Sequence, residues 1–589
     1  MLRYQLSELR QSCAQISFMC DTELRIVSGR GHLLIVKNKN RLMPVLLVQL
    51  LFIVLSVGYV LAMAPHGTLV ARDSYDAYFH LTRIQALNGI FQSPVNFDLW
   101  NHVGNGTAMF YPWLTVLPAL PLFNLFGAVH GFLVFLGLVT YATLISSYLS
   151  FRHYRKGQWA ALLFSVLYTF SFIRASNVLY RWGVGEYIAM IFIPPLFVAF
   201  RDVLLEHWSA WVWVAVWFSL IVYSHVLSAV VVGVCLFLLF LGALVGHIGQ
   251  WQYWRRLWQY AVAFLATAAC LTVAFWGPLL EQQRYQPIQG PSPFDLSKSA
   301  HPLGSLLGQS LTIDVRSYSL GFFLVVVCVG ILLTIWFTDT EGRILGGFTL
   351  FLLLFSTSVF PWAAFKDTPV SIIQYPARFL GMFSFFALAY TVRGLAQLFE
   401  HQHHVLASLG GWAAVLSVLV LFGLSARALW HTQTLIPQPW ATIANDTVAD
   451  HLRQFNQRDY FPANAFKHYQ SIESHDVLLD GKRVKASEVF TSDHMTWRLS
   501  SKKSGQLDLP VLNYKGTQVL LDNRRTIGVE SPRGTVQLTV PKGRHDVTVC
   551  GAYTAFSRVA QLISLLVAGL VLWIIKKQSQ ATTVETHTR

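Results

Sequence analysis

Acidic and basic side chains with the spacing of one helix face occur in a short polar stretch near the start of the chain. Asp73, Asp76, His80 and Arg83 follow one another at intervals of three or four residues. If residues 73–84 form a helix, this spacing places the four side chains on one stripe that faces water or a ligand. Two carboxylates beside a histidine can act as a general base or bind a divalent cation such as Mg²⁺ or Mn²⁺. The stripe therefore predicts a catalytic or metal site at Asp73 and Asp76, and the alternative is an Asp–His–Arg ladder of surface salt bridges.

Three later segments carry polar residues at the edges of apolar stretches. Arg181 and Glu186 precede one such stretch, His225 lies between two of them, and Gln374 and Arg378 open another. Guanidinium groups bind phosphate oxygens through paired hydrogen bonds, so both arginines are predicted to contact a phosphate. The alternatives are a glutamate that stabilises a helix N-terminus, an interfacial histidine, and an arginine that extends to the lipid headgroups.

The composition shows what kind of protein must position these residues. Of 589 residues, 54% are hydrophobic and 12% are charged, against roughly 25% charged in soluble proteins. Such a chain needs lipid around it, which excludes a soluble enzyme, a coiled coil, collagen and a disordered chain. The net charge of +15 is spread between apolar segments, so we expect no nucleic-acid partner. The 6 cysteines lack the spacing of a disulfide framework or a zinc site.

Apolar stretches of about 20 residues, the length of a membrane helix, recur along the chain. The stretches are 44–64, 109–127, 129–150, 158–175, 187–205, 209–224, 226–246, 258–280, 319–337, 344–361, 378–397, 405–427 and 558–575. Lys and Arg cluster in alternate loops, and the positive-inside rule assigns these loops and both termini to the cytoplasm. This assignment requires that one of the stretches 109–127 and 129–150 does not cross, and the prolines of 109–127 favour that stretch. We predict a re-entrant segment there and about twelve crossings elsewhere, which makes the chain a mainly α-helical, polytopic protein of the cell membrane.

The polar segment 428–557 differs from the rest of the chain. The dipeptide Asp480-Gly481 and the alternating runs 536–540 and 545–549 are typical of hairpins and strands. We expect a small extracytoplasmic β-sandwich before the last helix.

The chain is thus predicted to have four parts. They are a cytoplasmic N-terminal tail (1–43), a transmembrane domain (44–427), an extracytoplasmic β-rich domain (428–557) and a final helix with a cytoplasmic tail (558–589). In the third part, a short helix from Asp446, as N-cap, to Arg458 is expected to precede the strands.

The ionisable residues lie at the ends of the apolar stretches and not at their midpoints. Ion-coupled transporters and pumps place charges at mid-depth, so this distribution disfavours a transporter or lipid flippase. Carboxylates and arginines at the outer surface suit a lipid-linked phosphate whose tail stays in the bilayer. A non-enzymatic assembly or scaffold protein, which holds a partner with its β domain, is the other alternative.

Several motifs resemble those of a family of bacterial multi-spanning proteins. Residues 76–84 resemble the signature of the "6-pyruvoyl-tetrahydropterin synthase-related domain, membrane protein" family, and residues 542–547 resemble the last outer strands of YfhO-like proteins. Matching motifs follow in the same order, namely Phe110-Tyr111-Pro112-Trp113, Tyr180-Arg181 with Gly185-Glu186, Ser224-His225 and Gln374-Tyr375-Pro376 with Arg378. The resemblance extends over residues 44–575, and it departs at Ala377, where the pattern commonly has Trp.

That family is similar to the GT-C glycosyltransferases, which transfer a sugar from a polyprenyl-phosphate donor. The resemblance implies that Asp76 is the first choice for the base or metal ligand, with Asp73 second and Glu186 as the acid of the second loop. Arg181 and Arg378 would face the donor phosphate.

The remaining polar residues complete the expected site. His80 is assigned a catalytic role beside Asp76, and Arg83, His225 and Gln374 are assigned to substrate binding. The resemblance implies that the sugar moves to a cell-envelope glycan or lipid on the outer face of the membrane.

Overall fold

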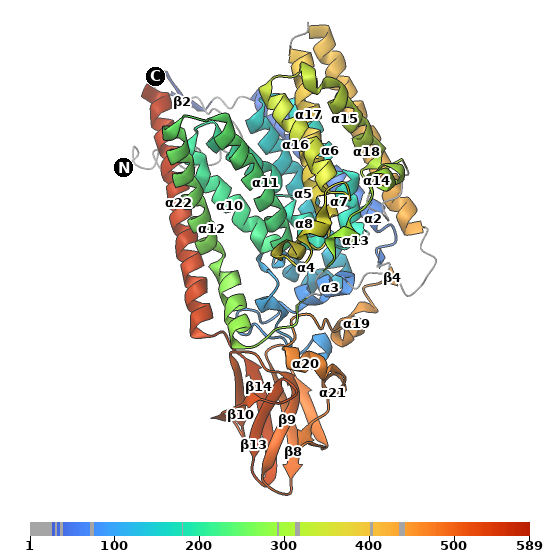
Figure 1. The fold of residues 1–589 in the computed structure, drawn as a ribbon, viewed down its shortest axis with the longest axis vertical. Helices are drawn as coiled ribbons and strands as arrows, with labels where there is room; N and C mark the ends of the chain where they lie inside the picture. Colours follow the sequence, from blue (N-terminus) through green and yellow to red (C-terminus); the bar gives the residue numbers. More distant parts are fainter. Residues whose placement is uncertain are drawn as a thin grey trace.

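The described part of the chain folds into a helical bundle with strands at one end. The computed structural model describes residues 26–29, 32–35, 39–70, 76–179, 181–290, 294–311, 319–400, 404–434 and 442–588. The strands near the C-terminus lie at one end of the molecule, and the C-terminal end of the last helix lies at the other (Figure 1).

Eight helices of the described residues are long and apolar enough to cross a membrane, so the chain is a multi-pass membrane protein. They are α2 (Lys39–Met63), α5 (Ala128–Tyr154), the consecutive pair α6 (Gln158–Thr169) and α7 (Phe172–Leu179), α11 (Val226–Gly246), α12 (Trp251–Tyr285), α17 (Leu380–Glu400), α18 (His404–Thr434) and α22 (Ala555–Thr588). The most apolar window of α22 is only 17% buried, because side chains such as Leu565 and Leu572 face outward, as lipid requires. The window in α6 and α7 is wholly buried, so this pair lies at the centre of the bundle.

Four further apolar stretches form helices that are shorter than a typical span. They are α9 (Ile193–Leu204), α10 (Trp211–Ser224), α15 (Gly321–Thr334) and α16 (Thr340–Phe355). The stretch 187–205 is divided into α8 (Val184–Ala189) and α9, and Pro194 and Pro195 begin the second helix. The count of about twelve crossings therefore stays a prediction.

The proline-rich stretch 109–127 is broken into short helices. They are η2 (Thr107–Met109), η3 (Leu114–Val116) and α4 (Ala119–Phe126). Helix α4 packs closely on α5, since a Cβ at Gly131 would lie 2.5 Å from the Leu122 carbonyl oxygen. These helices do not reach the length of a span, and re-entry from the outer side stays a prediction.

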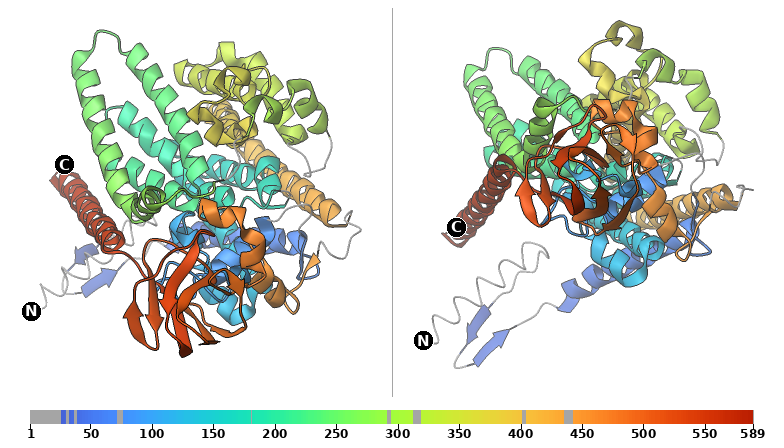
Figure 2. Two further views of the ribbon diagram at one scale, coloured as in Figure 1. Left: turned by 60° about the horizontal axis from the view of Figure 1, so that its bottom comes forward. Right: turned by 90° about the horizontal axis from the view of Figure 1, so that it is seen from below.

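The strands near the C-terminus form two five-stranded antiparallel sheets (Figure 2). One has the order β11 (Arg524–Thr526), β10 (Thr517–Leu521), β14 (Gly543–Gly551), β8 (His494–Ser501), β7 (Ala486–Phe490), and the other has β12 (Val529–Glu530), β13 (Thr535–Val540), β9 (Gly505–Leu512), β5 (Leu478–Leu479), β6 (Lys482–Arg483). Trp497 and Val547 of the first sheet share a hydrophobic core with Leu509 and Leu538 of the second. The sheets confirm the predicted β structure, and the assignment as a β-sandwich stays a prediction.

In this region, the predicted hairpin turn is confirmed, and the predicted helix N-cap is wrong. Asp480 and Gly481 have φ values of +49° and +75° and connect β5 to β6, as the hairpin signal predicts. The observed helix is shorter than the predicted one. It is α19, which spans Val448–Gln454 and has Thr447 before it. Asp446 therefore does not act as the N-cap, and the chain to Arg458 is not helical.

The remaining elements are short. They are β1 (Ile26–Gly29), β2 (His32–Ile35), β3 (Leu69–Val70), α3 (Asp76–Gln85), η1 (Trp100–His102), η4 (Trp208–Ala210), α13 (Leu296–Ser299), α14 (Leu303–Gln309), η5 (Ile335–Phe337), η6 (Trp362–Phe365), η7 (Pro369–Ile373), η8 (Pro376–Phe379), β4 (Thr442–Ile443), α20 (Ala463–Lys467) and α21 (Tyr469–Glu473). Strand β3 pairs with β4, which ties the chain before α3 to the chain before α19.

Candidate functional site

The predicted helix near residue 73 is observed as α3 from Asp76 onward, and Asp73 lies outside the described residues. Asp76 is exposed, whereas His80 and Arg83 are only 3% and 5% exposed. The predicted stripe of polar groups facing water is therefore wrong beyond Asp76. Aromatic side chains cover the helix instead, since the Phe79 and Tyr111 rings lie 5.4 Å apart and Tyr78 stacks on Phe455.

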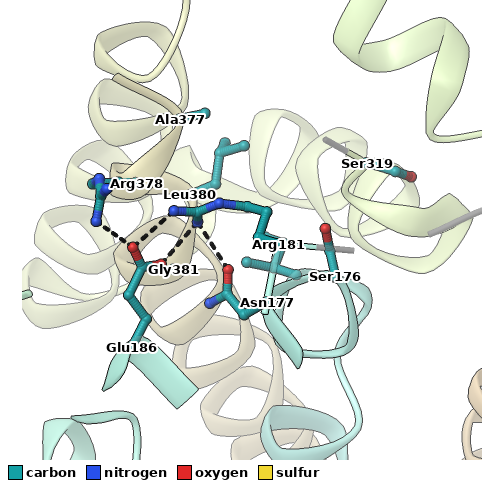
Figure 3. Close-up of a pocket in the computed structure, with 10 residues that line it drawn as sticks. Ser176, Asn177, Arg181, Glu186, Ser319, Ala377, Arg378, Leu380 and Gly381 are labelled. Carbon is teal, nitrogen blue, oxygen red and sulfur yellow. Dashed lines mark hydrogen bonds and ion pairs between the residues drawn. The ribbon is translucent and has the colours of Figure 1, made fainter. Parts of the chain in front are cut away.

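The centre of the site is one carboxylate between two guanidinium groups. Glu186 accepts two hydrogen bonds of 2.9 Å from Arg181 and a further one from Arg378 (Figure 3). Arg181 also donates to Asn177 at 3.1 Å, and Arg378 donates to Gln374 at 2.7 Å. The three charged side chains are at most 15% exposed. Residues that the sequence places in two separate segments thus form one ion-pair cluster.

The backbone around these residues requires small side chains and an unusual turn. Trp182 has a φ of +51° just before α8, and Gln374 has a φ of +66° between η7 and η8. A Cβ at Gly185 would lie 2.8 Å from the Ser224 carbonyl oxygen and 3.1 Å from the His225 side chain. Glycine at this position therefore lets α8 approach the junction of α10 and α11 and bring Glu186 beside His225.

The two arginines control the ionisation of Glu186. Burial alone would raise the pKa of this carboxyl, but the positive charges of Arg181 and Arg378 outweigh burial and hold its pKa well below the ordinary value. The carboxylate is ionised at neutral pH, so the three groups together carry one net positive charge. Such a cluster can bind an anion, and phosphate matches the planar donors of two guanidinium groups.

Asp76 belongs to the same electrostatic environment. Loss of hydration within the protein raises the pKa of Asp76, while the charges of Arg181 and Arg378 act against that rise. The negative charge of Glu186 raises the pKa of Asp76 further. An exposed carboxylate with a raised pKa is a better proton acceptor than an ordinary one, which is the property of a general base.

Two histidines, the buried His80 of α3 and the half-buried His225, belong to the surroundings of this cluster. Burial lowers the pKa of His225 to about 3, with Glu186 opposing and Arg378 and Arg181 assisting the change. Burial also lowers the pKa of His80, and the charge of Arg83 lowers it further. Both rings are therefore neutral at physiological pH, and they can orient neighbours but do not add positive charge. His225 also caps α11, because its Nδ1 accepts a hydrogen bond from the Ser228 backbone at 3.2 Å.

Arg83 packs behind the site rather than lining it. Its guanidinium group lies 4.3 Å from the centre of the Tyr111 ring and donates to the Pro112 carbonyl oxygen at 3.4 Å. Cation–π contact with Tyr111 gives a structural reason for its burial. The role of Arg83 in substrate binding stays a prediction.

Some residues of the site were not predicted. Tyr111 lies between Arg83 and His225, whose ring is 6.3 Å away. Tyr460, in the chain before the strands, stacks on Phe110 with ring centres 5.5 Å apart, and its neighbour Asp459 raises the pKa of Asp76. No local pattern near residue 460 signals this position, because about 380 residues separate it from α3.

A narrow pocket opens beside the ion-pair cluster (Figure 3). It is lined by Ile173, Ser176, Asn177, Arg181, Glu186, Ser319, Ala377, Arg378, Leu380 and Gly381. The lining combines the polar groups of the cluster with apolar side chains of membrane helices. The pocket therefore places groups that can bind an anion beside apolar side chains.

The described residues contain no group of three or more His, Cys, Asp or Glu side chains placed to bind a metal ion. Asp76 offers an exposed carboxylate, the ligand that Mg²⁺ and Mn²⁺ favour. The predicted metal pair of Asp73 and Asp76 lies partly outside the described residues and stays a prediction.

Comparisons with known proteins give only distant likenesses. No family model matches the chain, and no curated protein does. The arabinofuranosyltransferase AftD from Mycobacteria is similar in structure, with a TM-score of 0.40 and 14% identity over 69% of this chain and 29% of that chain. ArnT from Cupriavidus metallidurans, bound to undecaprenyl phosphate, has a TM-score of 0.32 and 11% identity over 65% of this chain and 75% of that chain. This chain thus corresponds to less than a third of AftD, and the resemblance to the 6-pyruvoyl-tetrahydropterin synthase-related and YfhO-like families stays a prediction.

Proposed function

We propose that this chain is a GT-C-type glycosyltransferase that moves a sugar from a polyprenyl-phosphate donor to a glycan or lipid of the cell envelope. The observation that carries the proposal is the arrangement of Asp76, Glu186, Arg181 and Arg378 in one environment at the strand-bearing end of the helical bundle. Carboxylates from two elements and guanidinium groups from two elements supply a base and an anion site beside apolar helices.

In the proposed reaction, Arg181 and Arg378 bind the phosphate of the donor, and their net positive charge replaces water around it. The apolar tail of the donor stays between membrane helices, next to Leu380 and Ile173 of the pocket. Gln374 holds Arg378 in position through its 2.7 Å hydrogen bond.

The chemical step forms one bond and breaks one. The acceptor oxygen bonds to the anomeric carbon, and its proton passes to Asp76. The bond from the anomeric carbon to the phosphate oxygen breaks, and the polyprenyl phosphate leaves with the electron pair. The arginines stabilise the charge that develops on this leaving group.

The neutral histidines have supporting roles in the proposal. His80 and His225 stay neutral and therefore leave the positive charge at the donor site to the arginines. A Mg²⁺ or Mn²⁺ ion bound by Asp76 and Asp73 would supply additional positive charge for the leaving phosphate.

The test uses purified protein and intact cells. Undecaprenyl phosphate, labelled in its tail, should bind wild-type protein in detergent and bind the Arg378→Gln variant much more weakly. Deletion of the gene should change the sugar composition of the envelope, and wild-type protein, but not Asp76→Asn, should restore it. An envelope of unchanged composition after deletion would exclude the proposed activity. Chelation of metal in the same assay shows whether Asp76 acts as a base or as a metal ligand.

A further inference from the structure

The outer face of one C-terminal sheet carries a polar groove remote from the site. The groove has a volume of about 640 Å³. Its lining includes Lys485, Ser487, Arg498, Ser500, Arg544 and Asp546. Because Met495, Trp497 and Leu499 of β8 point into the core, Arg498 and Ser500 point outward, away from it.

The strand register arranges the outward side chains in two rows. Arg498 lies opposite Ser487 on one side and Asp546 on the other. Ser500 lies opposite Arg544, and Lys485 directly precedes the strand whose Ala486 pairs with Leu499. The second row is therefore Lys485, Ser500 and Arg544, with adjacent strands about 4.8 Å apart.

The second row has positive charge that the described residues do not neutralise. Asp546 pairs with Arg498 at 3.3 Å, and Asp522 pairs with His545 at 2.8 Å. Within the described part of the chain, neither Lys485 nor Arg544 forms an ion pair with a carboxylate. Lys485 and Arg544, with the Ser500 hydroxyl between them, can therefore bind an anionic ligand.

The groove lies far along β14 from the end of that strand that contacts the helical part of the chain, which disfavours a lipid headgroup as its ligand. A Cβ at Gly551, the last residue of β14, would lie 2.6 Å from Ser93 Oγ, so this end of the strand contacts the loop after α3. Arg544 is seven residues earlier in the same strand, which corresponds to about 23 Å at 3.3 Å per residue. Figure 1 shows the same direction, with α22 joined at the near end of the sheets.

We propose that this groove binds an acidic glycan, a polysaccharide strand whose sugars carry carboxylate or phosphate groups. Lys485 and Arg544 would pair with its charges, and Ser487 and Ser500 would exchange hydrogen bonds with its hydroxyls. The outward rows contain no aromatic or aliphatic pocket that would anchor a peptide side chain, so a polyhydroxylated ligand fits better than an acidic peptide. This inference is independent of the transfer chemistry at Asp76.

Binding to the full chain in detergent tests the inference. The probes are tetragalacturonate, a phosphorylated dextran fragment of similar length, neutral maltotetraose and tetraglutamate. We expect one or both acidic glycans to bind, the neutral sugar to bind much more weakly, and added salt to weaken the acidic probes. The preferred acidic probe identifies whether carboxylate or phosphate is the recognised group.

The decisive variant is the double substitution Lys485→Gln and Arg544→Gln. It should weaken binding of the acidic glycan by roughly tenfold, as the loss of two exposed charge contacts implies. The matched control, Lys482→Gln with Lys502→Gln, removes the same charge outside the groove and should leave binding unchanged. Equal binding by both double variants would overturn the site, and tetraglutamate binding as tight as that of the glycans would overturn the ligand class. Since binding is measured without donor, failure here is distinguishable from failure of the transferase proposal.

Discussion

The single carboxylate of Glu186 between Arg181 and Arg378 is the residue-scale feature on which the site depends. A buried charge is tolerated only when it is paired and hydrogen-bonded, and here one anion satisfies two cations. The cluster keeps one net positive charge in surroundings that exclude water. The resulting field lowers the pKa of Glu186 and limits the rise in the pKa of Asp76. The same two arginines therefore act on two acids whose pKa values shift in opposite directions.

Replacement of Asp76 by Asn tests the proposed base. We expect transfer to fall by about 10²- to 10⁴-fold, the usual contribution of a general base, with the protein still inserted and bound to undecaprenyl phosphate. The control is Asp446→Asn, because Asp446 is exposed and does not cap α19. Rates of sugar transfer in membranes of both variants check the prediction, and an unimpaired Asp76→Asn variant would contradict it.

The pH dependence of transfer should report the ionisation of Asp76. A base must be deprotonated, and the raised pKa of Asp76 moves the acidic limb of the rate profile above that of an ordinary carboxyl. Arg181 lowers the pKa of Asp76, so Arg181→Gln should move this limb to higher pH. The profile at saturating donor is measured for this variant and for Arg256→Gln, which changes an exposed arginine elsewhere. If the acidic limb does not move in Arg181→Gln, Asp76 is not the group whose ionisation limits the rate.

Replacement of Glu186 by Gln should destabilise the fold, because it removes the carboxylate to which two buried guanidinium groups donate hydrogen bonds. The expected loss is about 3–5 kcal/mol, as for other broken buried pairs. Glu341→Gln is the control, since Glu341 pairs with Arg201 but its side chain is 36% exposed and should matter less. Thermal unfolding in detergent measures both, and added inorganic phosphate should restore stability to Glu186→Gln but not to Glu341→Gln.

At the scale of elements, helices were easier to predict than their breaks. Every apolar stretch predicted from composition contains helix in the structure, because about 20 apolar residues in lipid have no other way to satisfy their backbone. The division of 187–205 into α8 and α9 was not predicted, although Pro194 and Pro195 mark it. The break matters because it frees α8 to carry Glu186 toward Arg378.

The site itself was only partly predictable. Chemistry-bearing residue types at helix ends identified Asp76, Glu186, Arg181 and Arg378, since such groups are costly in lipid. The burial of His80 and Arg83 was missed, because helical spacing shows which residues share a face but not what covers that face. Tyr460 was missed because its contact with Phe110 is a long-range consequence of the tertiary fold.

The close packing of α8 can be tested at Gly185. The Gly185→Ala substitution puts a Cβ 2.8 Å from the Ser224 carbonyl oxygen, so α8 must shift and carry Glu186 with it. We expect weaker binding of undecaprenyl phosphate. We also expect a lower unfolding temperature, because the strain should reduce the free energy of unfolding by about 1–3 kcal/mol. Gly242→Ala in α11 is the matched control, because a Cβ there meets nothing within 4 Å. Identical binding by the two variants would show that α8 tolerates the displacement.

At the scale of the whole molecule, the C-terminal sheets are joined by hydrogen bonds to the chain that precedes them. Tyr514 of the sheet region donates a hydrogen bond of 3.0 Å to the Tyr460 carbonyl oxygen, and Gln289, after α12, pairs with the backbone of Tyr460 and Phe461. The chain between α19 and the strands is therefore held against both the helices and the sheets.

The proposed orientation predicts which ends of the molecule are accessible from outside the cell. Both termini are predicted to be cytoplasmic and the strands extracytoplasmic. A cysteine placed at Lys502, in the turn after β8, should react with a membrane-impermeant thiol reagent in intact cells, whereas a cysteine at Lys577, near the end of α22, should react only after permeabilisation. The reverse pattern would contradict the orientation and place the proposed site in the cytoplasm.

The length of β14 has a consequence for the size of the acceptor. The strand separates the groove at Arg544 from the loop beside α3 by about 23 Å, so a short oligosaccharide can occupy only one of the two places at a time. A long strand held at its middle by the sheet keeps its end at high local concentration near Asp76. Such tethering would make the proposed transferase prefer polymers over fragments, with repeated additions before release.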